Sequence, residues 1–247
     1  MTREMLSIGM NFSRWQDAVE AAIASEKLEV TGEVRGGQLI DFVDDSGAMM
    51  TILAAEPFTT FSGFAGASSV DAHVSMINDV LALSDIVNDE GYHVASVVST
   101  LAQGPLLVDE PTQQWQQLGL SALAVDVNVV TDGAEDAIGS FTSQGAEIVT
   151  AGSAASPDAT FVATLQLDTV ETRTNATTGD TFVHATTHSP FALDVLLPGS
   201  LASCVAGDVV SGSFLLAGRI IPPAGCGGDD GCGSGGCGCG SGGCGGH

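Results

Sequence analysis

The sequence predicts a mainly β fold, namely an antiparallel sandwich or barrel of about ten strands with one N-terminal amphipathic helix and a disordered Gly/Cys tail. Three observations carry this prediction. Apolar and polar residues alternate in many short segments, which is the period of a half-buried strand. Gly, Pro, Asn and Asp separate these segments at strand-length spacing. Helix-length gaps between the segments, which a doubly wound α/β fold requires, are absent.

The first predicted element is the helix, over residues 14 to 28. Ser13 and Gln16 have the spacing of a capping box, in which Ser13 is the N-cap. Behind them, apolar residues recur every three or four positions: Trp15, Ala18, Val19, Ala22 and Ile23. We expect this apolar stripe to pack on the rest of the protein.

After the helix the period changes to two. A β-hairpin is predicted around Gly36-Gly37, and a Thr-rich hairpin around residues 175 to 180. A loop is predicted over residues 57 to 67, whose Phe58, Phe61 and Phe64 should pack against the core. The strand-forming segments are residues 28–35, 38–44, 48–55, 70–87, 92–101, 123–130, 160–173, 181–187, 191–197 and 208–221.

The composition changes abruptly near the C-terminal end. We divide the chain into a β-rich body, residues 1–224, and a flexible Gly/Cys-rich tail, residues 225–247. Pro222-Pro223 ends the last strand, because proline cannot donate to a sheet ladder. The tail holds thirteen Gly and five Cys, and its segment 232–238 is repeated identically at 239–245. Such a glycine content predicts a tether without a core of its own.

The tail carries the predicted metal site. Thiolates with an imidazole are ligands for soft ions, which indicates Zn²⁺, Cu(I) or Ni²⁺, and the spacing does not select among them. In composition the tail resembles the Cys- and His-bearing tails of nickel-handling prolyl isomerases. That resemblance covers 23 of 247 residues, and the body shares none of their features. The predicted ligands are Cys226, Cys232, Cys237, Cys239, Cys244 and His247.

The charge excludes several partners. The chain has thirty Asp and Glu residues and six Lys and Arg residues, for a formal net charge of −24. Between Arg35 and Arg173 there is no Lys or Arg that could neutralise a phosphate, so nucleic acid and anionic membrane surfaces are not expected partners. The acids are scattered singly, which favours adaptation to a salty cytoplasm over a functional acidic patch. We also expect a cytoplasmic location, because no secretory signal and no membrane-length apolar segment occur.

Catalytic signatures are not found in the body, and no catalytic or cofactor-binding residue is predicted there. His184 and His188 should be two surface histidines on the same face of one strand, where about 13 Å would separate them, too far to share an ion. His73, His93 and Cys204 are isolated in the sequence, and we expect ordinary structural roles for them.

The favoured function is therefore a non-enzymatic protein whose tail binds or buffers a soft metal. The alternative is a structural or self-assembling β module, such as a jelly-roll subunit, with the tail as a tether. An enzyme of unknown class comes third. The sequence leaves homo-oligomerisation open.

The charge generates a test of stability. Raising NaCl from about 0.1 M to about 1 M shortens the screening length from about 10 Å to about 3 Å, which weakens repulsion among the acids. We expect the melting temperature in differential scanning calorimetry to rise by several degrees over this range. A melting temperature that stays constant or falls would show that self-repulsion does not limit stability.

Overall fold

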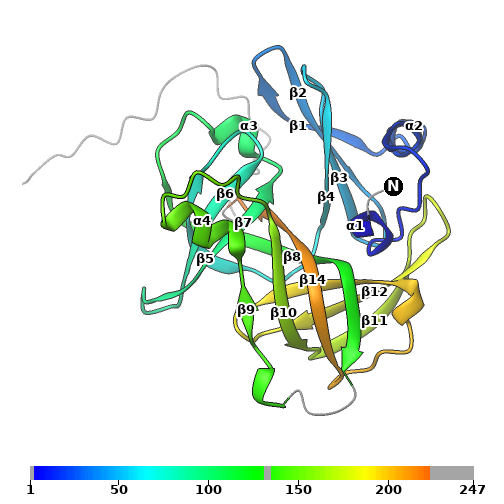
Figure 1. Cartoon of the computed structure of the whole chain (residues 1–247). Helices are drawn as coiled ribbons and strands as arrows, with labels where there is room; N and C mark the ends of the chain where they lie inside the picture. Colours follow the sequence, from blue (N-terminus) through cyan, green and yellow to red (C-terminus); the bar gives the residue numbers. More distant parts are fainter. Residues whose placement is uncertain (1–2, 131–134, 223–247) are drawn as a thin grey trace, which may run out of the picture.

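A computed structural model describes residues 3–130 and 135–222 of the chain. These residues form fourteen strands in two sheets, together with four short α-helices (Figure 1). The mainly β class is confirmed, while the expected strand number of about ten was too low. The helices are α1 (Arg3–Leu6), α2 (Trp15–Ala24), α3 (Gly104–Leu107) and α4 (Gln144–Thr150).

The smaller sheet has four antiparallel strands in sequence order. The hairpin at Gly36-Gly37 is confirmed, with Val34 paired to Gly37. The loop predicted over residues 57 to 67 was wrong, because its Thr- and Phe-rich part forms β4 against β3. Phe61 and Phe64 are buried on opposite faces of this sheet. The strands are β1 (Leu28–Val34), β2 (Gly37–Val43), β3 (Ala48–Leu53) and β4 (Thr59–Phe64).

The larger sheet has ten strands and is mixed, which corrects the antiparallel expectation. Strand β13 runs parallel to β8, and β14 runs parallel to β7. These pairs join segments far apart in the chain, so the local alternation pattern does not reveal them. The strands are β5 (Val70–Met76), β6 (Leu81–Val87), β7 (His93–Leu101), β8 (Gln113–Val130), β9 (Phe141–Thr142), β10 (Thr160–Gln166), β11 (Thr169–Thr174), β12 (Thr181–Thr187), β13 (Leu193–Pro198) and β14 (Val209–Ile220).

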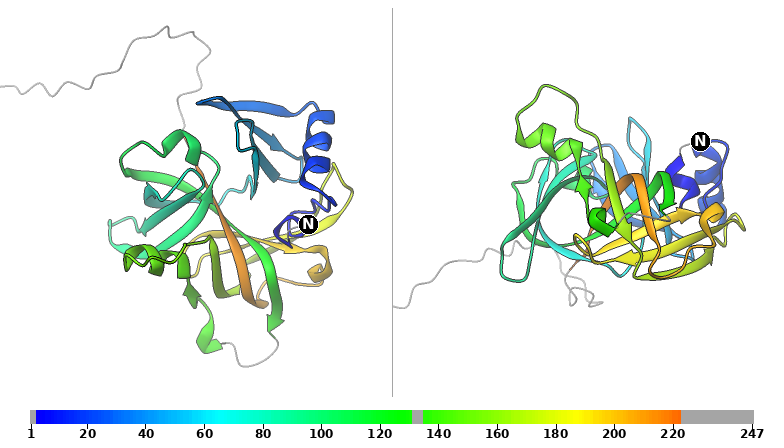
Figure 2. Two further views of the ribbon diagram at one scale, coloured as in Figure 1. Left: turned by 45° about the horizontal axis from the view of Figure 1, so that its top comes forward. Right: turned by 60° about the horizontal axis from the view of Figure 1, so that its bottom comes forward.

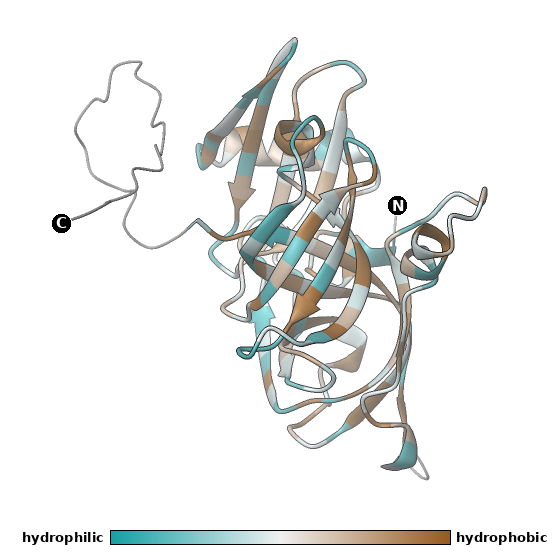
Figure 3. Ribbon diagram, turned by 90° about the vertical axis from the view of Figure 1, so that its left-hand side faces the viewer, coloured by the Kyte–Doolittle hydropathy of each residue, from teal (hydrophilic) through white to brown (hydrophobic). Residues whose placement is uncertain are grey.

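Part of the larger sheet closes on itself. Strands β8, β5, β6, β7 and β14 pair in that order, and β14 pairs back onto β8, so these five strands form a ring. The remaining strands extend from β8 and β14 as an open sheet, seen in yellow and green in Figure 2. Alternate residues of the ring strands face inward into the largest hydrophobic core, as the banded ribbons of Figure 3 illustrate.

The N-terminal helices cover the other face of the large sheet, together with the small sheet. Ala18 and Ala22 of α2 are buried in a second core with Phe182 of β12. Helix α2 is shorter than predicted, and Arg14 occupies its N-cap position without a side-chain hydrogen bond that caps the helix, so the expected Ser13 capping box was wrong. The helix ends before Glu26, whose left-handed backbone (φ 57°) cannot continue it.

A buried carboxylate joins the small sheet to the large one. Asp44, in the β2–β3 turn, is only 3% exposed. Its oxygens accept hydrogen bonds from Ser46 within that turn, and from Ala176 and Thr177 in the turn between β11 and β12. Burial alone would raise the pKa of Asp44, but these hydrogen bonds lower it below its ordinary value. The ionised carboxylate therefore stabilises the contact between the sheets.

Replacement of this carboxylate tests its contribution. We expect Asp44→Ala to lower the free energy of unfolding by about 3 kcal/mol at neutral pH, because several donors lose their acceptor in a buried site. The difference from wild type should shrink as the pH falls below about 4, the ordinary aspartate value, toward the lowered pKa of Asp44 in the folded protein. Urea denaturation at pH 7 and pH 3 measures both effects.

The neighbouring Asp45→Ala is the matched control, because that side chain is exposed. A cost at Asp44 no greater than at Asp45, or one unchanged at pH 3, would contradict the proposed role of the carboxylate.

Candidate functional sites

The six ligands predicted in the tail, Cys226, Cys232, Cys237, Cys239, Cys244 and His247, all lie outside the described residues. The body contributes Cys204, which is 6% exposed. Burial raises the pKa of the Cys204 thiol, and the charge of Asp208 raises it further. Cys204 is therefore held as a buried thiol and lacks the character of a reactive or metal-binding thiolate.

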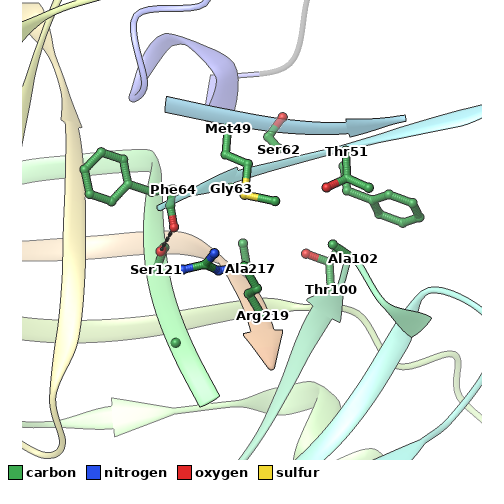
Figure 4. Close-up of a pocket in the computed structure, with 13 residues that line it drawn as sticks. Met49, Thr51, Ser62, Gly63, Phe64, Thr100, Ala102, Ser121, Ala217 and Arg219 are labelled. Atoms are coloured by element: carbon green, nitrogen blue, oxygen red, sulfur yellow. Dashed lines mark hydrogen bonds between the residues drawn. The ribbon is translucent and has the colours of Figure 1, made fainter. Parts of the chain in front are cut away.

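A small cavity lies between the small sheet and the ring (Figure 4). Its volume is about 20 Å³, room for a single water molecule and too little for a substrate. Polar groups line it from both sides: Thr51 and Ser62 from the small sheet, and Thr100, Ser121 and Arg219 from the ring. Ser121 donates a hydrogen bond to the carbonyl of Phe64 across the gap.

Arg219 is the charged group of this cavity. Its Nε atom is buried and has no hydrogen-bond partner among the described residues. Its positive charge also acts on Asp41 of the small sheet. Burial raises the pKa of Asp41, while hydrogen bonds from Thr51 and Thr31 and the charge of Arg219 limit that rise. Arg219 thus serves the contact between ring and small sheet, where it offsets the cost of burying Asp41.

His184 and His188 differ in burial and in their partners. His184 lies on β12, as expected for a strand, but its side chain is 13% exposed, so the expectation of a surface histidine was wrong. Its Nε2 lies 2.7 Å from Oδ1 of the buried Asp194, which also accepts a hydrogen bond from the Ser68 amide. His188 follows β12, is exposed, and pairs with Asp168. Each of the two histidines is therefore paired with one carboxylate.

Trp115 has an unusual backbone and a conspicuous position. It occupies a bulge of β8 opposite β5, at φ 54°, which is a genuine outlier for a bulky side chain. Its amide donates to Nδ1 of His73 at 3.2 Å, and its indole meets the His73 ring edge-on at 5.0 Å between centroids. The indole edge also lies against Gly91 in the β6–β7 turn. Even so, Trp115 is 58% exposed, and its indole lies on the outer surface of the five-stranded ring.

A row of polar side chains continues from Trp115 across the ring strands. His73 of β5 is in register with Asp85 of β6, and Asp85 with Ser96 of β7. The Ser96 hydroxyl donates to Asp85 at 2.6 Å, and Nε2 of His93 lies 2.9 Å from the same hydroxyl oxygen. His73 and His93, isolated in the sequence, thus belong to one surface row, and the local sequence carried no signal for this.

A surface hollow adjoins this row. Its volume is about 390 Å³, within the range of small-ligand sites. Asp71 and Gln117 line it from positions two residues along the strands from His73 and Trp115. Asn88 and Asp89 line it from the turn that carries Gly91. The indole and the hollow therefore share the β6–β7 turn.

The left-handed backbone at Trp115 predicts that glycine is more stable than alanine at this position, the reverse of the ordinary preference in a strand. Glycine adopts the left-handed region freely, whereas alanine there costs about 1 kcal/mol. We expect Trp115→Gly to be more stable to urea than Trp115→Ala by about that amount. The same pair at Gln116 is the control, because an ordinary strand position disfavours glycine. A Trp115→Ala variant at least as stable as Trp115→Gly would show that this conformation is not strained.

Two further properties concern the described part of the chain, residues 3–130 and 135–222. None of its helices has the length and apolar character needed to cross a membrane. No group of three or more His, Cys, Asp and Glu side chains within it is arranged to hold a metal ion. In comparisons with known proteins, no family model, no curated protein and no solved structure matches the chain.

Proposed function

We propose that this chain is a non-enzymatic β-rich protein whose Cys/Gly/His tail binds or buffers a soft metal ion. The observation that carries the proposal is the placement of the cysteines. Five of six lie within the last 22 residues of the chain, and the sixth, Cys204, is buried in the body. Thiolates are the preferred ligands of Zn²⁺ and Cu(I), and Ni²⁺ also binds thiolate and imidazole.

The repeat in the tail supports this function. Segments 232–238 and 239–245 are identical, and each begins with Cys and has a second Cys five residues later. Four thiolates from the two segments suffice for a tetrahedral ion, with Cys226 and His247 as further ligands. The intervening glycines and serines allow the chain to wrap around an ion, because glycine adopts most backbone conformations. Binding would order this segment locally, as in other small metal sites.

Metal titration of the reduced protein tests the proposal. We expect the full chain to bind at least one equivalent of Zn²⁺ in competition with a chromophoric chelator. Deletion of residues 225–247 should abolish binding, and so should Cys→Ser replacement at all five tail positions. Substitution by Co²⁺ should produce the near-ultraviolet charge-transfer absorption of thiolate ligation in the full chain alone.

Cys204→Ser is the matched control, and its Zn²⁺ binding should equal that of wild type because the thiol is buried. Equal binding by the full and deleted chains would overturn the proposal, as would the absence of binding by the full chain to Zn²⁺, Cu(I) and Ni²⁺.

A further inference from the structure

The aromatic residues of the chain are divided by chemistry between the core and the surface. Seven of the ten Phe residues are buried. The only Tyr and both Trp residues are instead among the exposed large side chains: Tyr92 at 68%, Trp115 at 58% and Trp15 at 47%. Indole and phenol rings have an apolar face and a polar edge, so they suit ligands that are themselves half apolar.

Trp115 is held outward by specific contacts. A tryptophan gains most when its ring is buried, yet here a left-handed backbone, a hydrogen bond to His73 and contact with Gly91 keep more than half of its surface in solvent. Local strain of this kind is retained in proteins chiefly where it serves a site. The exposed indole is therefore a candidate platform for a flat ligand.

The groups around the platform indicate the chemistry of that ligand. Groups that both donate and accept hydrogen bonds occur in the hollow and in the row: the Gln117 and Asn88 amides line the hollow, and the Ser96 hydroxyl and the His93 imidazole belong to the row. Carboxylates of Asp71, Asp85 and Asp89 accept only. No Lys or Arg occurs between Arg35 and Arg173, and none lines the hollow, so an anionic ligand has no partner here.

We propose that Trp115 and the adjoining hollow form a binding site for a neutral saccharide. The C–H face of a pyranose ring packs on an indole, whose face is electron-rich. Its hydroxyls at the ring edge then pair with the amides and carboxylates of the hollow, which holds about 390 Å³. This proposal does not depend on the tail, and it requires no metal.

The two tryptophans supply a matched pair of reporters. Trp15→Phe leaves Trp115 as the only indole, and Trp115→Phe leaves Trp15, which is exposed on α2. We would titrate both variants with neutral hexasaccharides of glucose, xylose and mannose. We expect at least one of these probes to shift and quench the fluorescence of Trp15→Phe, with no change in Trp115→Phe.

Calorimetry with the responding hexasaccharide then measures the contribution of each group. Trp115→Ala should weaken binding at least tenfold, Trp115→Phe less, because a ring remains, and Trp15→Ala not at all. Gln117→Leu should weaken binding several-fold, because it removes both a donor and an acceptor from the hollow. Circular dichroism checks that each variant is folded.

Three results would overturn the proposal. The first is the absence of any fluorescence change in Trp15→Phe with every hexasaccharide at millimolar concentration, which does not depend on a variant of the site. The second is undiminished binding by folded Trp115→Ala. The third is a response to tetramethylammonium chloride with none to the saccharides, which would identify the platform and its carboxylates as a cation site instead.

Discussion

The pairing of β8 with β14 is the constraint on which the rest of the architecture depends. The two strands are hydrogen-bonded from Leu118 and Ile220 at one end to Val130 and Val209 at the other. Strands β5 and β13 attach to β8, and β7 and β10 attach to β14, so both the ring and the open sheet grow from this pair. Gly212 allows the close approach of the two backbones, because a Cβ there would collide with the Asp126 carbonyl.

The small sheet is held to this framework by buried polar contacts as well as by apolar packing. Asp44 binds the β11–β12 turn, and Arg173 near that turn donates to the Ser46 carbonyl and lies over the Phe64 ring. On the other side of the turn, Asn175 and Thr178 donate to carbonyls of the N-terminal segment. One hairpin turn therefore contacts both the small sheet and the N-terminal segment, and its polar groups fix how the layers align.

The sequence predicts correctly those features that depend on residues close together in the chain. The Gly36-Gly37 hairpin follows from turn chemistry and the strand at residues 123–130 from alternation, and both are confirmed. The parallel pairs, the strand at Phe61 and the burial of His184 depend on partners that arrive from elsewhere in the chain. The surface row from Trp115 to His93 has the same origin, since each member is unremarkable in its own segment and only the register of four strands brings them together. The tail site remains a prediction from composition.

The late position of β14 in the chain also constrains how the protein folds as it is synthesised. The ring cannot close until the strand that forms its seam has been synthesised, and the contact between Thr100 and Leu216 spans 116 residues. Until then a nascent chain would present β7 and β8 as unpaired edges, which are templates for aggregation. A topology so rich in distant pairings is also expected to fold slowly, because loop closure precedes the gain from contact. A high density of repelling acids would keep such unfinished chains apart.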